Sequence, residues 1–262
     1  MSLPVLAIDT ATPQSGVALL CADGRYSVQR QRVTAHSESL LRLVQSCLDA
    51  CDLSLGQLAG IACSAGPGSF TGLRIGMATA KGLCFALGVP LCVVSSLESL
   101  ARASGGPEPE LATLVVLDAF RGQLFARLVP PRSDALSASP TRQTLSTLPQ
   151  LAVDSMWHPA DLARAVLPIA GAFRLCCVEP VPEQAQPLVA MALALSIDGG
   201  QSQSAATRDA LFEPPPLALA RLSAERLSRG QQADLFDVAP NYLCGSAPEE
   251  AERERLRASQ TA

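Results

Sequence analysis

The stretch AGPGSFTGLRIGMATAKGL, residues 65–83, joins a short apolar run to the start of a helical pattern. Gly66 and Gly68 permit positive φ angles, and Ser69 or Thr71 can cap the helix that follows. Such a turn points main-chain N–H groups at one spot, which suits a phosphate or another anion. The same glycines also let a strand, a loop and another helix pack closely, so both interpretations stay open. No Gly-Lys-Ser/Thr ends the loop, which excludes a Walker phosphate loop.

The helix expected over residues 71–87 carries small residues every four positions, at Gly72, Gly76 and Ala80. A stripe with almost no side chain lets another helix approach closely. A second helix, expected over 36–51, offers more apolar surface than one core-facing stripe needs. We therefore expect both helices to dock on a partner, although both faces could instead be buried in their own lobe. The interface residues that we predict are His36, Leu40, Leu41, Val44, Cys47, Leu48, Gly72, Leu73, Gly76, Met77 and Ala80.

The order of strand-like runs repeats along the chain. Runs at 3–9, 15–21 and 24–32 predict a three-strand meander, followed by strands at 60–65 and 90–95. After the glycine-proline stretch 105–109 the pattern restarts with strands at 112–118 and 123–129. The first strand of each half ends in an aspartate, Asp9 or Asp118. These features predict a duplicated meander with α/β units.

Four regions follow from this pattern. We expect an N-terminal lobe over 1–105 that carries the partner interface, and a second lobe with flexible insertions over 110–216. A C-terminal helix and a strand-like segment should fill 217–245, with Gly230 placed to cap the helix. Alternating Glu and Arg predict a solvated tail over 246–262.

Composition limits the classes of protein that are possible. The 262 residues are 48% hydrophobic and 17% charged, typical of a globular protein with a large core. No apolar run approaches the ~20 residues of a membrane span, and the N-terminus lacks a signal pattern, so we expect a cytoplasmic protein. The net charge of −4 gives no basic field that could hold nucleic acid unaided. Nine cysteines without a C-x-x-C motif are expected to be reduced, mostly core thiols.

The residues typical of catalysis are few. The two histidines, His36 and His158, have no neighbour at metal-ligand spacing, so we expect no metal and no other cofactor. Asp9 with Thr10 and Thr12 could meet a phosphate or Mg²⁺, or could simply stabilise a turn. The residues of this possible vestigial phosphate loop are Asp9, Thr10, Thr12, Gly66, Gly68, Ser69 and Arg74.

Five segments together resemble the TsaB family of bacterial tRNA threonylcarbamoyladenosine biosynthesis proteins. They are LAIDTAT, AGPGSFTGLRIGMATAKGL, VPLCVVSSLESLA, LDAFRGQLF and APNYL. The resemblance implies an α/β protein with a two-lobed actin-like, ribonuclease-H-type fold, in which mixed sheets are flanked by helices. TsaB-type proteins are similar to the catalytic TsaD subunit, whose metal-binding histidines fall here at Ser96 and Leu100. A hydroxyl and an isobutyl group cannot replace two imidazoles on a metal.

The resemblance therefore implies a non-catalytic scaffold that supports a TsaD-type transferase in modifying the tRNA adenosine next to the anticodon. The implied partners are the TsaD-type subunit in a heterodimer and a TsaE-type ATPase through the complex. Contact with tRNA would be indirect, the chain could form a homodimer in isolation, and no membrane is involved. The alternative is an ATP-binding enzyme of the sugar-kinase and actin-like class. That enzyme would need a second glycine-rich loop after Asp118, where AFRGQL offers only Gly122.

Overall fold

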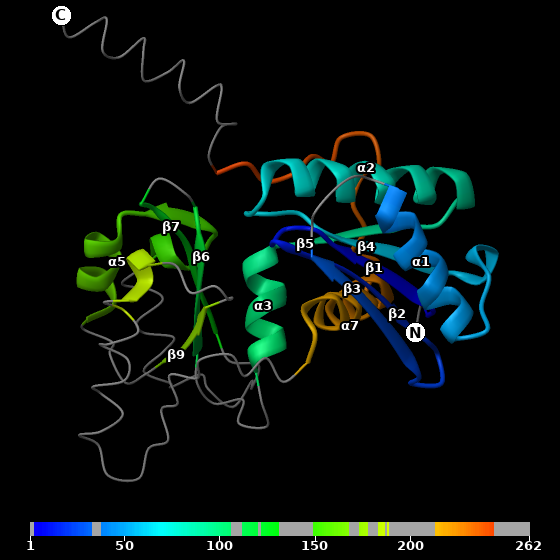
Figure 1. The fold of residues 1–262 in the computed structure, drawn as a ribbon, viewed down its shortest axis with the longest axis horizontal. Helices are drawn as coiled ribbons and strands as arrows, with labels where there is room; N and C mark the ends of the chain where they lie inside the picture. Colours follow the sequence, from blue (N-terminus) through cyan, green and yellow to red (C-terminus); the bar gives the residue numbers. More distant parts are fainter. Residues whose placement is uncertain are drawn as a thin grey trace, which may run out of the picture.

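The chain forms two lobes, each built around one β-sheet, in the computed structural model (Figure 1). The first sheet lies between residues 5 and 94, and the second between residues 112 and 177. The residues that the structure describes are 3–32, 38–105, 112–119, 122–130, 149–167, 173–177, 183–186, 188 and 213–243.

The first sheet has five strands in the order β3-β2-β1-β4-β5. Its first three strands form an antiparallel meander, whereas β4 and β5 run parallel to β1. Every residue of β1 is buried, as expected for a central strand with helices on both faces. The strands are β1 (Val5–Asp9), β2 (Gln14–Leu20), β3 (Tyr26–Arg32), β4 (Gly60–Ser64) and β5 (Leu91–Val94).

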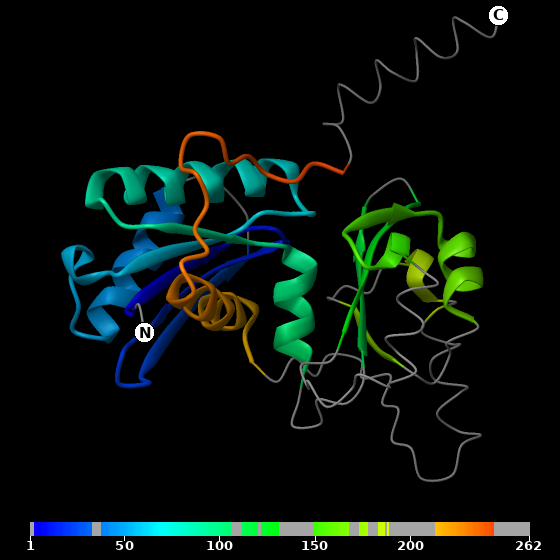
Figure 2. The same ribbon diagram turned by 180° about the vertical axis from the view of Figure 1, so that it is seen from behind.

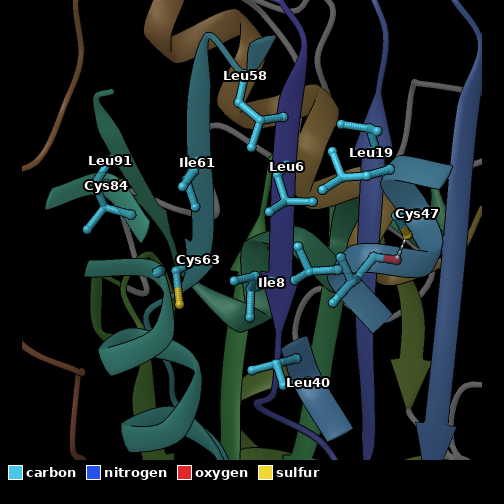
Figure 3. Close-up of a cluster of buried hydrophobic side chains, with 14 of the residues drawn as sticks. Leu6, Ile8, Leu19, Leu40, Cys47, Leu58, Ile61, Cys63, Cys84 and Leu91 are labelled. Carbon is cyan, nitrogen blue, oxygen red and sulfur yellow. Dashed lines mark hydrogen bonds between the residues drawn. The ribbon is translucent and has the colours of Figure 1, made fainter. Parts of the chain in front are cut away.

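Three helices cover the two faces of this sheet. Helices α1 (Glu38–Ala50) and α2 (Phe70–Leu87) pack on one face, and α7 (Pro215–Ser228) packs on the other. Figure 3 shows Leu40 and Cys47 of α1 in one apolar layer with Leu6 of β1. The chain therefore returns to its first lobe after the second, since α7 contacts β1 and β2.

Local signals in the sequence fix where several helices begin and end. The Ser69 hydroxyl accepts a hydrogen bond from the Gly72 N–H (3.2 Å), which caps the start of α2. Gly88 ends this helix in the left-handed conformation (φ +67°). The Ser95 hydroxyl caps α3 (Ser96–Ser104) in the same way, and a capping box at Ser54 opens the short 3₁₀ turn η1 (Leu55–Gln57).

Among the described residues, the second sheet repeats the order of the first with one strand fewer, as β8-β7-β6-β9. Strands β6, β7 and β8 form an antiparallel meander, and β9 runs parallel to β6. This confirms the predicted duplication of the meander. The elements are β6 (Ala112–Asp118), β7 (Leu124–Val129), η3 (Pro149–Leu151), β8 (Ser155–Trp157), α5 (Pro159–Val166), β9 (Phe173–Cys177) and η5 (Glu183–Ala185).

Helix α3 stands between the two sheets (Figures 1 and 2). Its Leu97 and Leu100 pack with Val115 of β6 and Phe125 of β7 in one buried cluster, while α5 covers the other face of the second sheet. Helix α3 also contacts α7 of the first lobe. The two lobes are therefore joined through a packed helix.

Two further expectations concern the thiols and the membrane. The cysteines that the structure describes are free, and all of them are buried except Cys177, which is half-buried. None of the helices within the described ranges combines the length and apolarity that crossing a bilayer demands. The predicted tail over 246–262 lies outside the described residues.

Candidate functional site

The glycine loop is packed against the chain's own first turn. The Ser69 N–H donates to the Ala11 carbonyl (2.7 Å), so this N–H is not directed at solvent. Gly68 lies so close to Ala11 that a Cβ at this position would overlap the Ala11 carbonyl. The Gly66 carbonyl accepts a hydrogen bond from the Ser96 N–H (2.8 Å), which ties the loop to the start of α3. These contacts favour the packing interpretation of the loop over the anion cradle.

The three polar residues after β1 are buried. Asp9, Thr10 and Thr12 expose only 4%, 2% and 9% of their surfaces. The Ala11 N–H donates to Asp9 Oδ1 (3.2 Å), and the Thr10 N–H donates to the Ser64 hydroxyl (3.3 Å). Burial raises the pKa of the Asp9 carboxyl above its ordinary value, because desolvation disfavours the charged form. Asp9 is therefore better placed to stabilise the turn after β1 than to bind a solvated phosphate or Mg²⁺.

The two cations of α2 contact the C-terminal segment of the chain. Residues 231–243, which we call the strap, follow α7 and run over α2 (Figures 1 and 2). Lys81 Nζ donates to the carbonyls of Phe236 (3.5 Å) and Val238 (3.1 Å). Arg74 Nε donates to the Tyr242 hydroxyl (3.1 Å). Arg74 and Lys81 therefore contact neutral groups of the protein itself, a tyrosine hydroxyl and two main-chain carbonyls.

The structure corrects most of the predicted partner interface. The described side chains of that prediction face the first sheet, except Leu41, which is 52% exposed. A Cβ at Gly76 would overlap the Thr10 hydroxyl, and a Cβ at Gly72 would overlap the Thr10 carbonyl. This stripe therefore allows α2 to lie close to the turn after β1. The buried members are Leu40, Val44, Cys47, Leu48, Leu73, Gly76, Met77 and Ala80; His36 lies outside the described residues.

Helix α2 also has an outward face that sequence reasoning missed. Ala78, Gly82 and Ala86 recur every four residues and are all exposed. A Cβ added at Gly82 would meet no atom within 4 Å, so this part of the helix faces open space. Phe85, beside this stripe, is 72% exposed. We call Ala78, Gly82, Phe85 and Ala86, together with the nearby Thr71, the outward face of α2. The four-residue spacing of Ala78, Gly82 and Ala86 can be read from the sequence. The stripe that faces the turn after β1 has the same spacing, so the sequence alone does not distinguish the two.

A pocket of about 80 Å³ lies between the beginnings of α1 and α2. Hydroxyl groups line much of it, and Arg32 lies at its edge. The Thr10 hydroxyl beneath it is buried and has no hydrogen-bond partner among the described residues. A pocket of this size admits a few water molecules or one small polar group. Its lining residues are Thr10, Ser15, Gln31, Arg32, Ser39, Leu40, Leu43, Ser69, Thr71, Gly72 and Ile75.

Ser96 and Leu100, where the family resemblance places the transferase histidines, lie at the start of α3. Ser96 is 2% exposed, and Leu100 is 1% exposed within the apolar cluster between the lobes. Within the described part of the chain, no group of three or more His, Cys, Asp or Glu residues is arranged to hold a metal ion. Neither side chain fits a metal site of the transferase kind, because Leu100 supplies only apolar atoms.

Comparison with solved structures identifies the class of fold. A structure described as YeaZ from Pseudomonas aeruginosa matches 93% of this chain and 100% of its own with a TM-score of 0.65 at 22% identity. A second structure from that organism, described as an uncharacterized protein with similarity to peptidase YeaZ, gives a TM-score of 0.66 at 23% identity over the same shares. With the repeated sheet order, these matches define a two-lobed actin-like α/β protein.

The chain belongs to the TsaB family. The tRNA threonylcarbamoyladenosine biosynthesis protein TsaB of Bacillus subtilis is 38% identical over 130 residues, which are 48% of this chain and 55% of that protein. The TsaB of Escherichia coli is 34% identical over 46% of this chain and 52% of its own length. The chain thus spans about half the length of these two named relatives. An uncharacterized protein of Mycobacterium tuberculosis is 35% identical over 71% of this chain and 83% of its own length.

A family model also matches part of the chain. The model of TsaD, tRNA N6-adenosine threonylcarbamoyltransferase, covers residues 30–129. This range contains α1, α2 and α3 and extends through β7.

Proposed function

We propose that this protein is a non-catalytic subunit that binds and supports a TsaD-type transferase. The supported reaction is the threonylcarbamoylation of the tRNA adenosine next to the anticodon. Two findings support this proposal: the relatives named TsaB are named for that biosynthesis, and the TsaD model matches residues 30–129. A cytoplasmic location, indirect contact with tRNA, and contact with a TsaE-type ATPase through the complex belong to the same proposal.

The observation that carries the non-catalytic role is the chemistry at the start of α3. Where the transferase would place metal-binding histidines, this chain has Ser96 and Leu100, and Leu100 lies in the apolar cluster between the lobes. An isobutyl group in that cluster contributes packing and has no electron pair for a metal. A TsaB-type chain with these residues needs a partner to supply the transfer chemistry.

The surface best suited to the partner is the outward face of α2, and Leu41 of α1 is a further exposed apolar side chain. Small exposed residues at four-residue spacing allow the main chain of another helix to come close. The exposed Phe85 and Leu41 add large apolar side chains, of the kind that anchor protein interfaces. A homodimer formed by the isolated chain would use the same face.

The test is to express this chain and a TsaD-type transferase separately and together, and to measure modification of tRNA. We expect the pair to elute as one complex and to support threonylcarbamoylation with the accessory ATPase. This chain with the accessory ATPase, but without the transferase, should transfer nothing. Transfer by this chain without a TsaD-type protein would overturn the proposal, as would failure of the two chains to associate.

A further inference from the structure

The strap begins at the edge of the first sheet. After Gly230, the Ala233 N–H donates to the Leu91 carbonyl (2.8 Å), which extends the sheet by one bridge beside β5. The Asp234 carboxylate then accepts the Phe236 N–H (2.8 Å) and so fixes a turn. Leu235 and Val238 pack against the apolar layer under α2. The strap is thus an ordered part of the first lobe.

Helix α2 holds the strap at two points that lie two turns apart. Lys81 contacts the carbonyls of Phe236 and Val238 near the middle of the strap. Near its end, the Arg74 guanidinium lies over the rings of Phe70 (4.0 Å) and Tyr242 (5.6 Å). The Phe70 and Tyr242 rings also pack on each other, with their centroids 4.7 Å apart.

The end of the strap reaches the junction between the lobes. The Asn241 N–H donates to the Ala65 carbonyl (2.6 Å), and its side-chain amide donates to Asp154 Oδ2 (3.4 Å). Asp154 lies directly before β8 of the second lobe and also accepts the Ser95 hydroxyl (2.8 Å) at the start of α3. Leu243 packs against the buried cluster between the lobes. One short segment therefore contacts α2, the glycine loop and the second lobe.

We propose that the strap couples α2 to the lobe junction, so that a protein docked on the outward face of α2 also restrains the second lobe. The coupling runs from Lys81 through the strap to Asn241 and then to Asp154. Each step is a direct contact, and no single step requires a rearrangement of the sheet. The inference rests on the proposed function only for the identity of the docked protein.

The experiment is hydrogen–deuterium exchange on the full chain, comparing the original protein with Lys81→Met. Methionine keeps the length and apolar stem of the side chain but cannot donate to the strap carbonyls. We expect faster exchange in the strap and also in peptides that contain Ser95–Glu98 and Asp154–Trp157, by about threefold or more. Arg229→Met is the matched control, because it removes an exposed cation at the end of α7 and should change neither region.

A second variant tests the end of the strap that contacts the second lobe. Asn241→Leu removes the amide that contacts Asp154 but keeps the main-chain bond to Ala65, and it should loosen the junction peptides while the middle of the strap stays protected. Faster exchange confined to the strap in Lys81→Met, with unchanged junction peptides, would overturn the coupling.

The same measurement with the TsaD-type transferase bound completes the test. Binding should slow exchange in the junction peptides of the original chain and have less effect on them in Lys81→Met, although both chains bind. Binding that leaves the junction of the original chain unchanged would overturn the coupling. If no transferase binds, the proposed function is contradicted, and the free-chain comparison still decides whether the strap reaches the junction.

Discussion

Asp9 is placed like a catalytic carboxylate, but its burial and its hydrogen bond show that it stabilises the fold. It ends β1, where an actin-like ATPase would meet phosphate, but it is 4% exposed and accepts the Ala11 N–H. The glycine loop packs against the turn that follows Asp9. The Ser69 N–H donates a hydrogen bond to the Ala11 carbonyl, and Gly68 lies against Ala11. The corresponding residue of the second lobe, Asp118, is exposed.

Replacing Asp9 by asparagine should raise the free energy of unfolding at pH 7. Burial raises the pKa of Asp9 above 3.8, so the folded state binds this proton more tightly than the unfolded chain does. The contribution of Asp9 to stability therefore falls as the pH rises from about 3.8 through the raised pKa, and stays low above it. Asparagine keeps an oxygen for the Ala11 N–H and carries no charge. We expect a gain of about 1 kcal/mol at pH 7 and almost none near pH 4, measured by urea unfolding.

Asp118→Asn provides the matched control for this prediction. It removes a carboxylate from the equivalent strand end, where the side chain is exposed. We expect it to change the free energy of unfolding at pH 7 much less than Asp9→Asn does. If Asp9→Asn were to destabilise the protein equally at pH 4 and pH 7, the carboxylate would be contributing through geometry rather than through charge.

At the scale of one element, α2 carries two stripes of small residues with opposite environments. Gly72, Gly76 and Ala80 face the turn after β1, and Ala78, Gly82 and Ala86 face outward. Both stripes repeat every four residues along the same helix. The spacing in the sequence predicts close approach on each face, but it cannot show which face meets the protein's own sheet.

Leucine substitutions at two glycines should separate these roles. Gly76→Leu forces a side chain into the Thr10 hydroxyl, and we expect it to destabilise the isolated chain by roughly 1–3 kcal/mol or more. Gly82→Leu enters open space and improves helix propensity, so the chain should stay folded. If the outward face docks the transferase, Gly82→Leu should weaken co-elution of the two chains. Thermal unfolding and size-exclusion chromatography measure both effects.

The predictions for Gly76→Leu and Gly82→Leu can be contradicted independently of each other. A stable Gly76→Leu chain would contradict the packing of α2 against the turn after β1. An unaffected complex with Gly82→Leu would remove the outward face of α2 from the proposed interface, although family membership would stand.

Much of the architecture could be predicted because local patterns determine it. Alternating and continuous apolar runs indicated the meanders, and Ser69 caps its helix as expected. The strap was not predicted, because its contacts to the rest of the chain join residues far apart in the sequence, such as Lys81 and Phe236, which are 155 positions apart. Arg74 was predicted in a possible phosphate loop, but the tertiary fold places it against the Tyr242 hydroxyl, and Lys81 against two main-chain carbonyls. The candidate docking face was misplaced for a related reason, since burial is a property of the folded lobe.

At the scale of the whole molecule, the duplicated sheets are joined by packing and by charge. Helix α3 contributes Leu97 and Leu100 to the cluster between the lobes. The same helix carries Glu98. Its carboxylate accepts a hydrogen bond from Nη2 of Arg226 on α7 (2.6 Å), and it also lies 3.8 Å from Nη1 of Arg127 on β7. Arg127 also pairs with Asp154 (3.2 Å). One acidic side chain therefore lies between cations from both lobes.

Glu98→Gln should weaken this junction. Glu98 is 21% exposed and its two arginines are 30% and 24% exposed, so water screens these pairs less than it screens surface ion pairs. Glutamine retains the shape but removes the counter-charge of Arg226, while Arg127 keeps Asp154, and we expect a loss of about 1–2 kcal/mol in the free energy of unfolding. A double-mutant cycle with Arg226→Met should return most of that loss as coupling energy.

The control for this cycle is an exposed pair in the second lobe. Arg164 and Asp161 lie 3.2 Å apart on α5, with side chains 78% and 59% exposed. Asp161→Asn should change stability by less than about 0.5 kcal/mol, because water already screens that pair. Equal effects of Glu98→Gln and Asp161→Asn in the same urea titrations would show that the charge of Glu98 does not help to hold the lobes together. A larger effect at Glu98 would show that charge as well as packing sets how the two halves of this duplicated fold meet.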